Sequence, residues 1–244
     1  MYWILYEGID ANFQMIGVGH SLSWEENDNG IFHFEISKSG KIIKKTIYEF
    51  PLALINQNES KSVQNKNDQN EKKDYAGIKN LEIVKIVENT DGSLLVIGSQ
   101  KTSLGMAYYT YGNILVCKID ESGTLLWINK IPRNMGGYYC GLNYYKYKNI
   151  DYIFFADNTK NENISDNVDP KYFMSEFSGN LIAYKIDDTT RKSSRSSVLD
   201  INNINGICGS YFFRNNFIET FQQTLVIEIM TDKHKEVFVK MKIK

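Results

Sequence analysis

Histidine, cysteine and proline are scarce in this chain, and the scarcity of histidine narrows its chemistry. The 244 residues include three of each type. The histidines are His20, His33 and His234, and their spacing matches no zinc-ligand pattern. A serine or cysteine triad would need a histidine base within a recognisable motif, and the sequence contains none. These residues therefore support neither a zinc site nor a nucleophilic triad.

The three cysteines are an odd and widely spaced set. Cys117 takes a strand position that Phe34 and Tyr184 take in related segments, so we expect a small residue of the core. Cys140 and Cys208 could pair, but nothing in their spacing requires it. The number and spacing of the cysteines are compatible with an oxidising and with a reducing compartment.

A charge of one sign and a long apolar run are both missing. The formal net charge is −1, from 28 Lys and Arg against 29 Asp and Glu. Without a basic field, nucleic acid is not an expected partner. No run reaches the roughly 18 apolar residues of a transmembrane helix.

Residues 1–8 lack the features of a signal peptide and resemble a strand. We expect the C-terminal part of a longer protein, which would be periplasmic or extracellular if that protein is exported.

A strand-turn-strand unit recurs along the chain. Residues 30–42 align with residues 112–125, and the offset from Gly40 to Gly123 equals the offset from Ile31 to Ile114, which is 83 residues. A third copy at residues 179–190 keeps the strand but replaces the turn glycine. Repeated short hairpins are typical of a β-array whose members bury their faces on each other.

The alternation within the copies predicts how the strands are buried. Alternate residues of each copy form one apolar face, and the opposite face begins apolar and ends charged, as in Ile31, His33 and Glu35. We predict an all-β fold of antiparallel sheets in a β-propeller-like repeat array, complete or as an incomplete arc, with about four sheet units. The alternative is a β-sandwich. Residues 1–244 would form one repeat domain, with a flexible polar insertion at about residues 56–76.

One stretch resembles a known repeat. Residues 112–132, preceded by residues 90–100, resemble the β-propeller repeat, and the chain is similar to uncharacterised β-propeller-repeat-like proteins of Bacteroidota-type bacteria. In that family an Ile-Pro ending leads into a DN-x-x-N stretch, matched here by residues 157–161. The first copy departs from the pattern, since it has no Trp where Trp127 stands in the second. The resemblance implies a propeller-type fold in an exported protein and carries over no catalytic residue.

Tyrosines concentrate near predicted loops and strand starts. Exposed aromatic faces could stack on sugars or grip a partner chain, although aromatics are also common in strands. The candidate ligand-binding residues are Tyr108, Tyr109, Tyr111, Tyr138 and Tyr139.

A second candidate is a calcium site in an oxygen-rich loop. Asp157, Asn161 and Asn163 supply hard ligands, but the spacing is not that of an EF-hand, and a solvated loop is the alternative. No other cofactor is expected. Asp120 and Asp187 stand just before hairpin turns, where Asp hydrogen-bonds its own backbone, so we expect structural roles for them.

The patterns favour a non-catalytic binding or scaffold module that contacts a protein or a glycan through its loops. The alternative is an enzyme on a propeller, such as a glycan-active hydrolase or lyase, which requires acidic or histidine residues to converge on one mouth of the array. Asp157 and Asp169 clustered with tyrosines in a pocket would favour the enzyme. A purely structural fragment is a third possibility.

Overall fold

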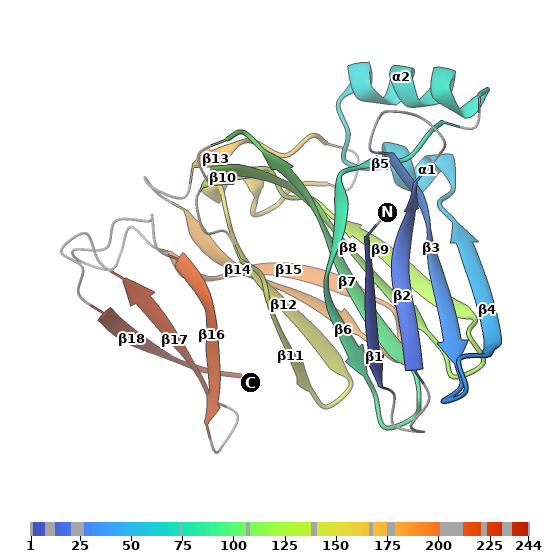
Figure 1. Cartoon of the computed structure of the whole chain (residues 1–244). Coiled ribbons are helices and arrows are strands. Elements are labelled where there is room, and N and C mark those ends of the chain that lie inside the picture. The colour runs from blue at the N-terminus through green and yellow to red at the C-terminus, as the bar shows by residue number, and fades with distance from the viewer. Residues whose placement is uncertain are drawn as a thin grey trace. The chain divides into compact units, whose positions relative to one another are not determined.

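The strands of the described residues form four sheets that follow one another along the chain (Figure 1). The computed structural model describes residues 2–7, 13–20, 27–73, 75–105, 108–137, 141–165, 168–174, 179–200, 212–220, 224–230 and 236–243. Each sheet is built mainly from strands that are neighbours in the sequence, as a propeller-type array requires.

The sheets differ in size. The first contains β1 (Tyr2–Glu7), β2 (Phe13–His20), β3 (Asn27–Ile36) and β4 (Ile42–Glu49), with β5 (Ile78–Lys79) paired to β3. The second contains β6 (Leu81–Glu88), β7 (Leu94–Ser103), β8 (Tyr109–Ile119), β9 (Leu125–Ile131), β10 (Met135–Gly137) and β13 (Phe173–Met174). The third contains β11 (Asn143–Tyr147), β12 (Ile150–Asp157), β14 (Asn180–Asp187) and β15 (Ser193–Asp200). The fourth contains β16 (Phe212–Thr220), β17 (Thr224–Met230) and β18 (Glu236–Lys242).

The pairing is antiparallel apart from the short parallel pair of β10 and β13. The prediction of an all-β fold of antiparallel sheets in a propeller-like repeat array is therefore confirmed. A single turn of 3-10 helix, η1 (Thr159–Asn161), follows β12.

The three sequence copies are three hairpins, formed by β3 with β4, β8 with β9, and β14 with β15. In the first two, the turn glycines Gly40 and Gly123 have φ of 79° and 86°, which glycine adopts without steric cost. The third turn is one residue longer, because the Asp187 amide donates to the carbonyl of Lys192, five residues on, rather than four. Arg191 takes the positive φ there, at 59°.

The chain divides into two compact units, each described by itself. Unit 1 comprises residues 1–102, 112–132 and 165–169, and unit 2 comprises residues 103–111, 133–164 and 170–244. The prediction of one domain over residues 1–244 stays a prediction.

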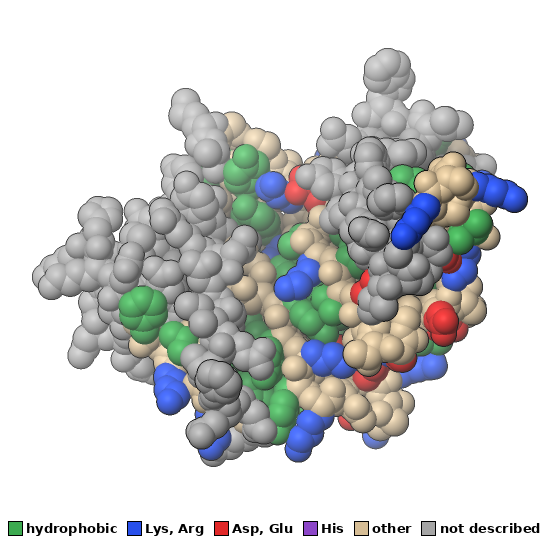
Figure 2. Space-filling model, turned by 60° about the horizontal axis from the view of Figure 1, so that its bottom comes forward, with side chains coloured by type: hydrophobic (Ala, Val, Ile, Leu, Met, Phe, Trp, Pro, Cys, Tyr) green, Lys and Arg blue, Asp and Glu red, His purple; other side chains and the backbone are tan. Residues whose placement is uncertain are grey.

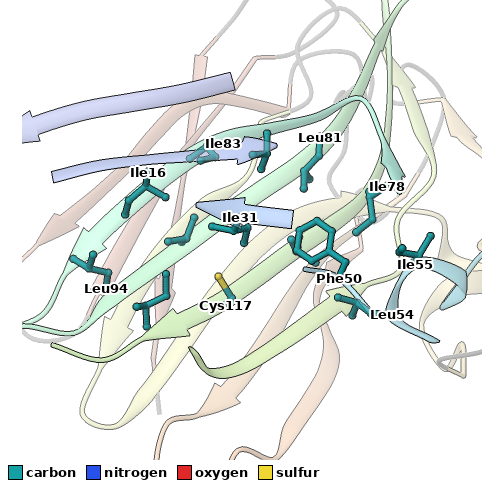
Figure 3. Packing of buried hydrophobic residues seen from close by; sticks show 14 of the residues in the cluster. Ile16, Ile31, Phe50, Leu54, Ile55, Ile78, Leu81, Ile83, Leu94 and Cys117 are labelled. Atoms are coloured by element: carbon teal, nitrogen blue, oxygen red, sulfur yellow. The ribbon is translucent and has the colours of Figure 1, made fainter. Parts of the chain in front are cut away.

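The core of unit 1 is an aliphatic cluster between its strands. Figure 3 shows Cys117 of β8 among these side chains, close to Ile31 of β3. Cys117 has no exposed surface, which confirms its place in the core, and burial raises the pKa of its thiol to about 12. Cys140 and Cys208 lie outside the described residues. The buried members are Ile16, Val18, Ile31, Phe50, Leu54, Ile55, Ala76, Ile78, Leu81, Ile83, Leu94, Val96, Leu115, Cys117 and Ile119.

Unit 2 has its own core, built around β12 and β14. Buried aromatic residues contribute more here than in unit 1, since Tyr152 and Phe154 stack with ring centroids 6.0 Å apart. The buried members are Met135, Tyr152, Phe154, Ala156, Phe173, Leu181, Ala183, Leu225 and Ile243.

Residues 56–76, expected as a flexible polar insertion, contain helix α2 (Lys61–Glu71) at one end of the first sheet (Figure 1). The flexibility of this insertion stays a prediction. Helix α1 (Leu52–Asn56) precedes α2 and buries Leu54 and Ile55 in the core. Helix α2 lacks an apolar face, and polar contacts hold it instead. The Asn67 amide donates to Asn56 Oδ1 at 2.9 Å. No helix in the described residues is long and apolar enough to cross a membrane.

Candidate functional site

A cavity of about 520 Å³ in unit 1 is lined by six charged residues. Small-molecule sites commonly occupy roughly 300–1,000 Å³, so its size is adequate for a ligand. Residues from β2, β3 and β4 form one side, and the β6–β7 and β8–β9 turns form the other. The lining comprises Gln14, His33, Glu35, Lys44, Glu88, Thr90, Asp91, Gly92, Leu94, Asp120 and Glu121.

Burial separates the lining into three levels. The buried residues Gln14, His33 and Leu94 form the floor. Thr90, Asp91 and Glu121 are exposed and form the rim. Between them lie half-buried residues, which are Glu35, Lys44, Glu88, Gly92 and Asp120.

Close contacts beside this cavity join the β8–β9 turn to β4 and to the β6–β7 turn. The Lys44 ammonium donates to the backbone carbonyl of Glu121 at 2.5 Å. A Cβ at Gly123 would lie 2.9 Å from Thr46 Oγ1, and a Cβ at Gly92 would lie 3.1 Å from Glu121 Cγ. Glycine at both turns therefore allows a positive φ and also lets the β8–β9 turn approach β4 and the β6–β7 turn.

Each turn beside the cavity contains an aspartate that holds its own backbone. Asp91 Oδ1 accepts hydrogen bonds from the Ser93 amide at 3.0 Å and the Ser93 hydroxyl at 2.5 Å. Asp120 Oδ1 accepts from the Thr124 amide at 2.7 Å and the Ser122 hydroxyl at 2.6 Å. These donors lower the pKa of both carboxyl groups, so both are ionised at neutral pH.

The predicted structural roles of the two aligned aspartates are confirmed. Asp187 also accepts from backbone amides, those of Thr189 at 3.0 Å and Thr190 at 2.7 Å.

His33 is a buried, neutral imidazole on the floor of the cavity. Its side chain contacts Gln14 through His33 Nε2 and Gln14 Oε1, 2.7 Å apart. In this orientation the glutamine oxygen accepts, so Nε2 carries the proton and Nδ1 is the unprotonated nitrogen. His33 Nδ1 is buried without a hydrogen-bond partner. Burial, and then the nearby Lys44 ammonium, lower the pKa of His33 to about 4.

Negative charge dominates the lining. Five carboxylates face one ammonium, and that ammonium, Lys44 Nζ, lies 3.3 Å from Glu35 Oε2. The whole chain has a net charge of only −1. Basic and acidic side chains also lie interspersed on the described part of the face in Figure 2. The excess of carboxylates is thus a local property of the cavity.

The tyrosine candidates are only partly within the described residues. Tyr109 and Tyr111 lie on β8 with ring centroids 6.2 Å apart, and the Tyr108 and Tyr172 hydroxyl oxygens are 3.3 Å apart. Tyr138 and Tyr139 lie outside the described residues. Ligand binding by these tyrosines stays a prediction.

Two of the candidate calcium ligands, Asp157 and Asn161, already interact with other groups of the protein. Asp157 is fully buried, forms an ion pair with Arg195, and accepts from the Asn161 amide at 2.9 Å. Asn161 Oδ1 accepts from the Lys171 amide at 2.8 Å, and Asn163 is exposed. A calcium ion would have to displace the Arg195 guanidinium, so this geometry gives the calcium prediction no support. The part of the chain that the structure describes gathers no group of three His, Cys, Asp or Glu side chains suited to a metal ion.

Sequence reasoning missed the residues that converge. Asp157 is buried and Asp169 is exposed, and neither lines the charged cavity. One pattern in the sequence does point to the cavity. On one face of β3, Ile31 is followed by His33 and Glu35, and both of these residues line the cavity. That face was interpreted as a change from buried to solvated surface.

Comparisons with known proteins find similarity only at the level of structure. No family model and no curated protein matches the sequence. Among the solved structures that match, a mutant of Synechocystis apocarotenoid oxygenase is 9% identical with a TM-score of 0.42, over 100% of this chain and 47% of that chain. The cobalt-substituted Synechocystis enzyme is 8% identical with a TM-score of 0.42, over 99% of this chain and 47% of that one. A chimera of the oxygenase with RPE65 is 9% identical with a TM-score of 0.39, over 99% and 47%.

The expectation of a non-catalytic module is corrected here. Acidic residues and a histidine do converge on one cavity, which is the requirement set above for the alternative, an enzyme on a propeller. This chain spans about half the length of the solved structures named above, and similarity at this level transfers no reaction, substrate or metal to it.

Proposed function

We propose that unit 1 is a glycoside hydrolase whose active site is the charged cavity. The observation that carries this proposal is the convergence of five carboxylates and a neutral buried imidazole from three hairpins on one cavity of about 520 Å³. Glycoside hydrolysis needs two carboxyl groups with different protonation states, one as proton donor and one as base or nucleophile.

The carboxyl groups of this cavity fit two roles. Asp120 is held ionised by its turn donors, which suits a base that removes a proton from the attacking water. A glutamate, Glu88 or Glu121, would donate a proton to the glycosidic oxygen. The bond from the anomeric carbon to that oxygen breaks, and the water oxygen bonds to the anomeric carbon.

His33 has a positioning role in this proposal. As a neutral imidazole with Nε2 donating to Gln14 Oε1, it would hold the Gln14 side chain at the cavity floor.

A lyase fits the cavity less well than a hydrolase. Elimination from a uronic acid requires a cation that neutralises the carboxylate of the substrate. Lys44 is the one ammonium among the lining residues and already pairs with Glu35, so the excess of carboxylates would repel an anionic sugar.

The test is hydrolysis of an oligosaccharide panel by the purified chain, followed by mass spectrometry. We expect cleavage of at least one glycosidic linkage, and loss of cleavage in the double variant Glu88→Gln/Glu121→Gln with an unchanged Tm. Glu49→Gln is the matched control, because Glu49 is exposed on β4 and lies outside the lining. Failure to cleave any oligosaccharide, or full activity of the double variant, would reject the proposal.

A further inference from the structure

We propose that a small cavity in unit 2 binds a short-chain monocarboxylate. The cavity has a volume of about 170 Å³ and is lined by residues of β12, β14 and β15 in the third sheet and by the end of β18 in the fourth. All the lining residues belong to unit 2, so this inference does not depend on the hydrolase proposed for unit 1.

Most of the cavity wall is apolar. Phe154 and Ala183 pair across β12 and β14, and both are buried in the core of unit 2. Met241 and Val198 add aliphatic surface, and Val198 is 39% exposed, which places it on the solvent side of the cavity. The volume is roughly that of six water molecules in the liquid, so a ligand of about six to eight non-hydrogen atoms would fill it. Walls of this kind favour a hydrocarbon group.

A cation is placed at this apolar wall. Lys185 lines the cavity and pairs across the sheet with Tyr152, and its ammonium lies 5.6 Å from the centroid of the Tyr152 ring. No carboxylate in the described part of the chain forms an ion pair with Lys185. The charge of Lys185 is therefore available to an anionic ligand.

A hydroxyl without a partner stands beside this cation. Tyr152 lines the cavity and is 2% exposed, yet within the described residues its hydroxyl makes no hydrogen bond, whereas the Tyr144 hydroxyl donates to Asp151. The Tyr152 hydroxyl is also not among the polar atoms that are closed to solvent. Burial raises the pKa of Tyr152, so the hydroxyl keeps its proton at neutral pH and can donate it to a ligand.

A carboxylate matches these two donors, and its hydrocarbon chain matches the wall. Its two oxygens accept from the Lys185 ammonium and the Tyr152 hydroxyl, and hydrogen bonds with ionised partners are about twice as strong as neutral ones. An amine would face the like charge of Lys185. A neutral alcohol would leave this charge unpaired, and a sugar would place polar groups against the apolar wall.

The experiment is an NMR titration of the whole chain at neutral pH with three ligands of equal chain length, which are hexanoate, 1-hexanol and hexylamine. We expect hexanoate to bind at least about tenfold more tightly than hexanol, as a hydrogen bond with a charged group predicts. Hexylamine should bind most weakly, because Lys185 repels its ammonium. Equal binding of hexanoate and hexanol would overturn the inference.

Variants tie the preference to the cavity. Lys185→Met keeps an apolar side chain and removes the charge, so it should lower the affinity for hexanoate to about that for hexanol. Lys240→Met is the matched control, because Lys240 is exposed on β18 and lies outside the lining, and it should leave the affinity unchanged. A preference for hexanoate that survives Lys185→Met, or that Lys240→Met reduces equally, would refute the proposed site.

A second variant tests the hydroxyl without disturbing the charge. Tyr152→Phe removes a group that has no hydrogen bond in the described structure, so we expect the fold and the Tm to be retained. The affinity for hexanoate should fall about threefold to tenfold, and that for hexylamine should not. If Tyr152→Phe binds hexanoate as tightly as the parent chain does, the carboxylate does not occupy this cavity.

Discussion

Asp120 and Asp187 each hold the turn of one copy of the repeated hairpin, but only the first of them lines the charged cavity of unit 1. Both accept backbone hydrogen bonds at 2.7 Å, Asp120 from the Thr124 amide and Asp187 from the Thr190 amide. In both cases these donors lower the pKa of the carboxyl group. The pair therefore offers a way to separate the role of a turn aspartate from the role of a cavity carboxylate.

We expect Asp120→Asn to lower the hydrolysis rate by at least about 100-fold, the lower end of what general acid–base groups contribute. Asparagine retains the acceptor oxygen of the turn and removes the charge. Asp187→Asn makes the same change in unit 2 and should leave the rate unaltered. The check is the initial rate on the cleaved oligosaccharide, with Tm recorded for both variants. A similar loss in both variants would assign the effect to turn stability and not to catalysis.

His33 should make the stability of the chain depend on pH. Its folded-state pKa of about 4 lies below the ordinary value of 6.5, so the unfolded chain binds a proton more readily than the folded chain. Stability is therefore full above pH 6.5 and is lost as the pH falls toward 4, by about 3 kcal/mol at most. The neighbouring charges are Lys44, which lowers the pKa of His33, and Glu35, which raises it.

The measurement is Tm across this pH range for the parent chain and for His33→Gln. We expect the variant to lose less Tm on acidification, because glutamine does not titrate. Asp187→Asn serves as the control, since its depressed pKa acts only below the ordinary value of 3.8. Parallel Tm curves for the parent chain and His33→Gln would contradict the prediction.

The hairpins could be predicted from sequence because their signals are local. Gly40 and Gly123 each stand within a few residues of the strands that they join, and their turns are as expected. The cavity could not be predicted in this way. Lys44 and Glu121 are 77 residues apart, and no local pattern predicts that β4 contacts the β8–β9 turn.

The helical segment was missed for a different physical reason. Helix α2 has one apolar residue, Val63, so its sequence shows no amphipathic period. Its polar contacts are made with residues just before it, such as Asn56, and the loop between the helices is held by Lys130, whose ammonium donates to Glu59. The contact of Lys130 with Glu59 is tertiary, and composition does not reveal it.

Alanine substitutions at Gly40 and Gly123 compare the cost of an unfavourable φ with the cost of a steric clash. Both have a positive φ, but a Cβ at Gly40 would meet nothing within 4 Å, whereas a Cβ at Gly123 would lie 2.9 Å from Thr46 Oγ1. Gly40→Ala should therefore destabilise by the conformational cost alone, roughly 1–2 kcal/mol. Gly123→Ala should cost more, because Thr46 or the backbone must also move. Equal losses in the free energy of unfolding in urea would show that the β8–β9 turn and β4 are not in close contact.

The buried pair of Lys130 and Glu59 should contribute more to stability than an exposed pair of the same type. The Lys130 side chain is 1% exposed, and its ammonium lies 2.8 Å from Glu59 Oε1 and donates to the Ile55 carbonyl at 2.8 Å. Lys130→Met would leave the Glu59 carboxylate and the Ile55 carbonyl without this donor. We expect a loss of about 3 kcal/mol in the free energy of unfolding.

The exposed pair of Lys101 and Glu82 is the control for this substitution. Its charged atoms are 3.3 Å apart, and both side chains are about 30% exposed. Solvent screens such a pair, so Lys101→Met should cost less than about 1 kcal/mol. The double variant Lys130→Met/Glu59→Gln should be more stable than Lys130→Met alone, because glutamine leaves no unpaired charge. Urea unfolding with linear extrapolation measures all three values. If Lys130→Met costs no more than Lys101→Met, the ion pair does not anchor the helical segment, and the apolar contacts of Leu54 and Ile55 must hold it instead.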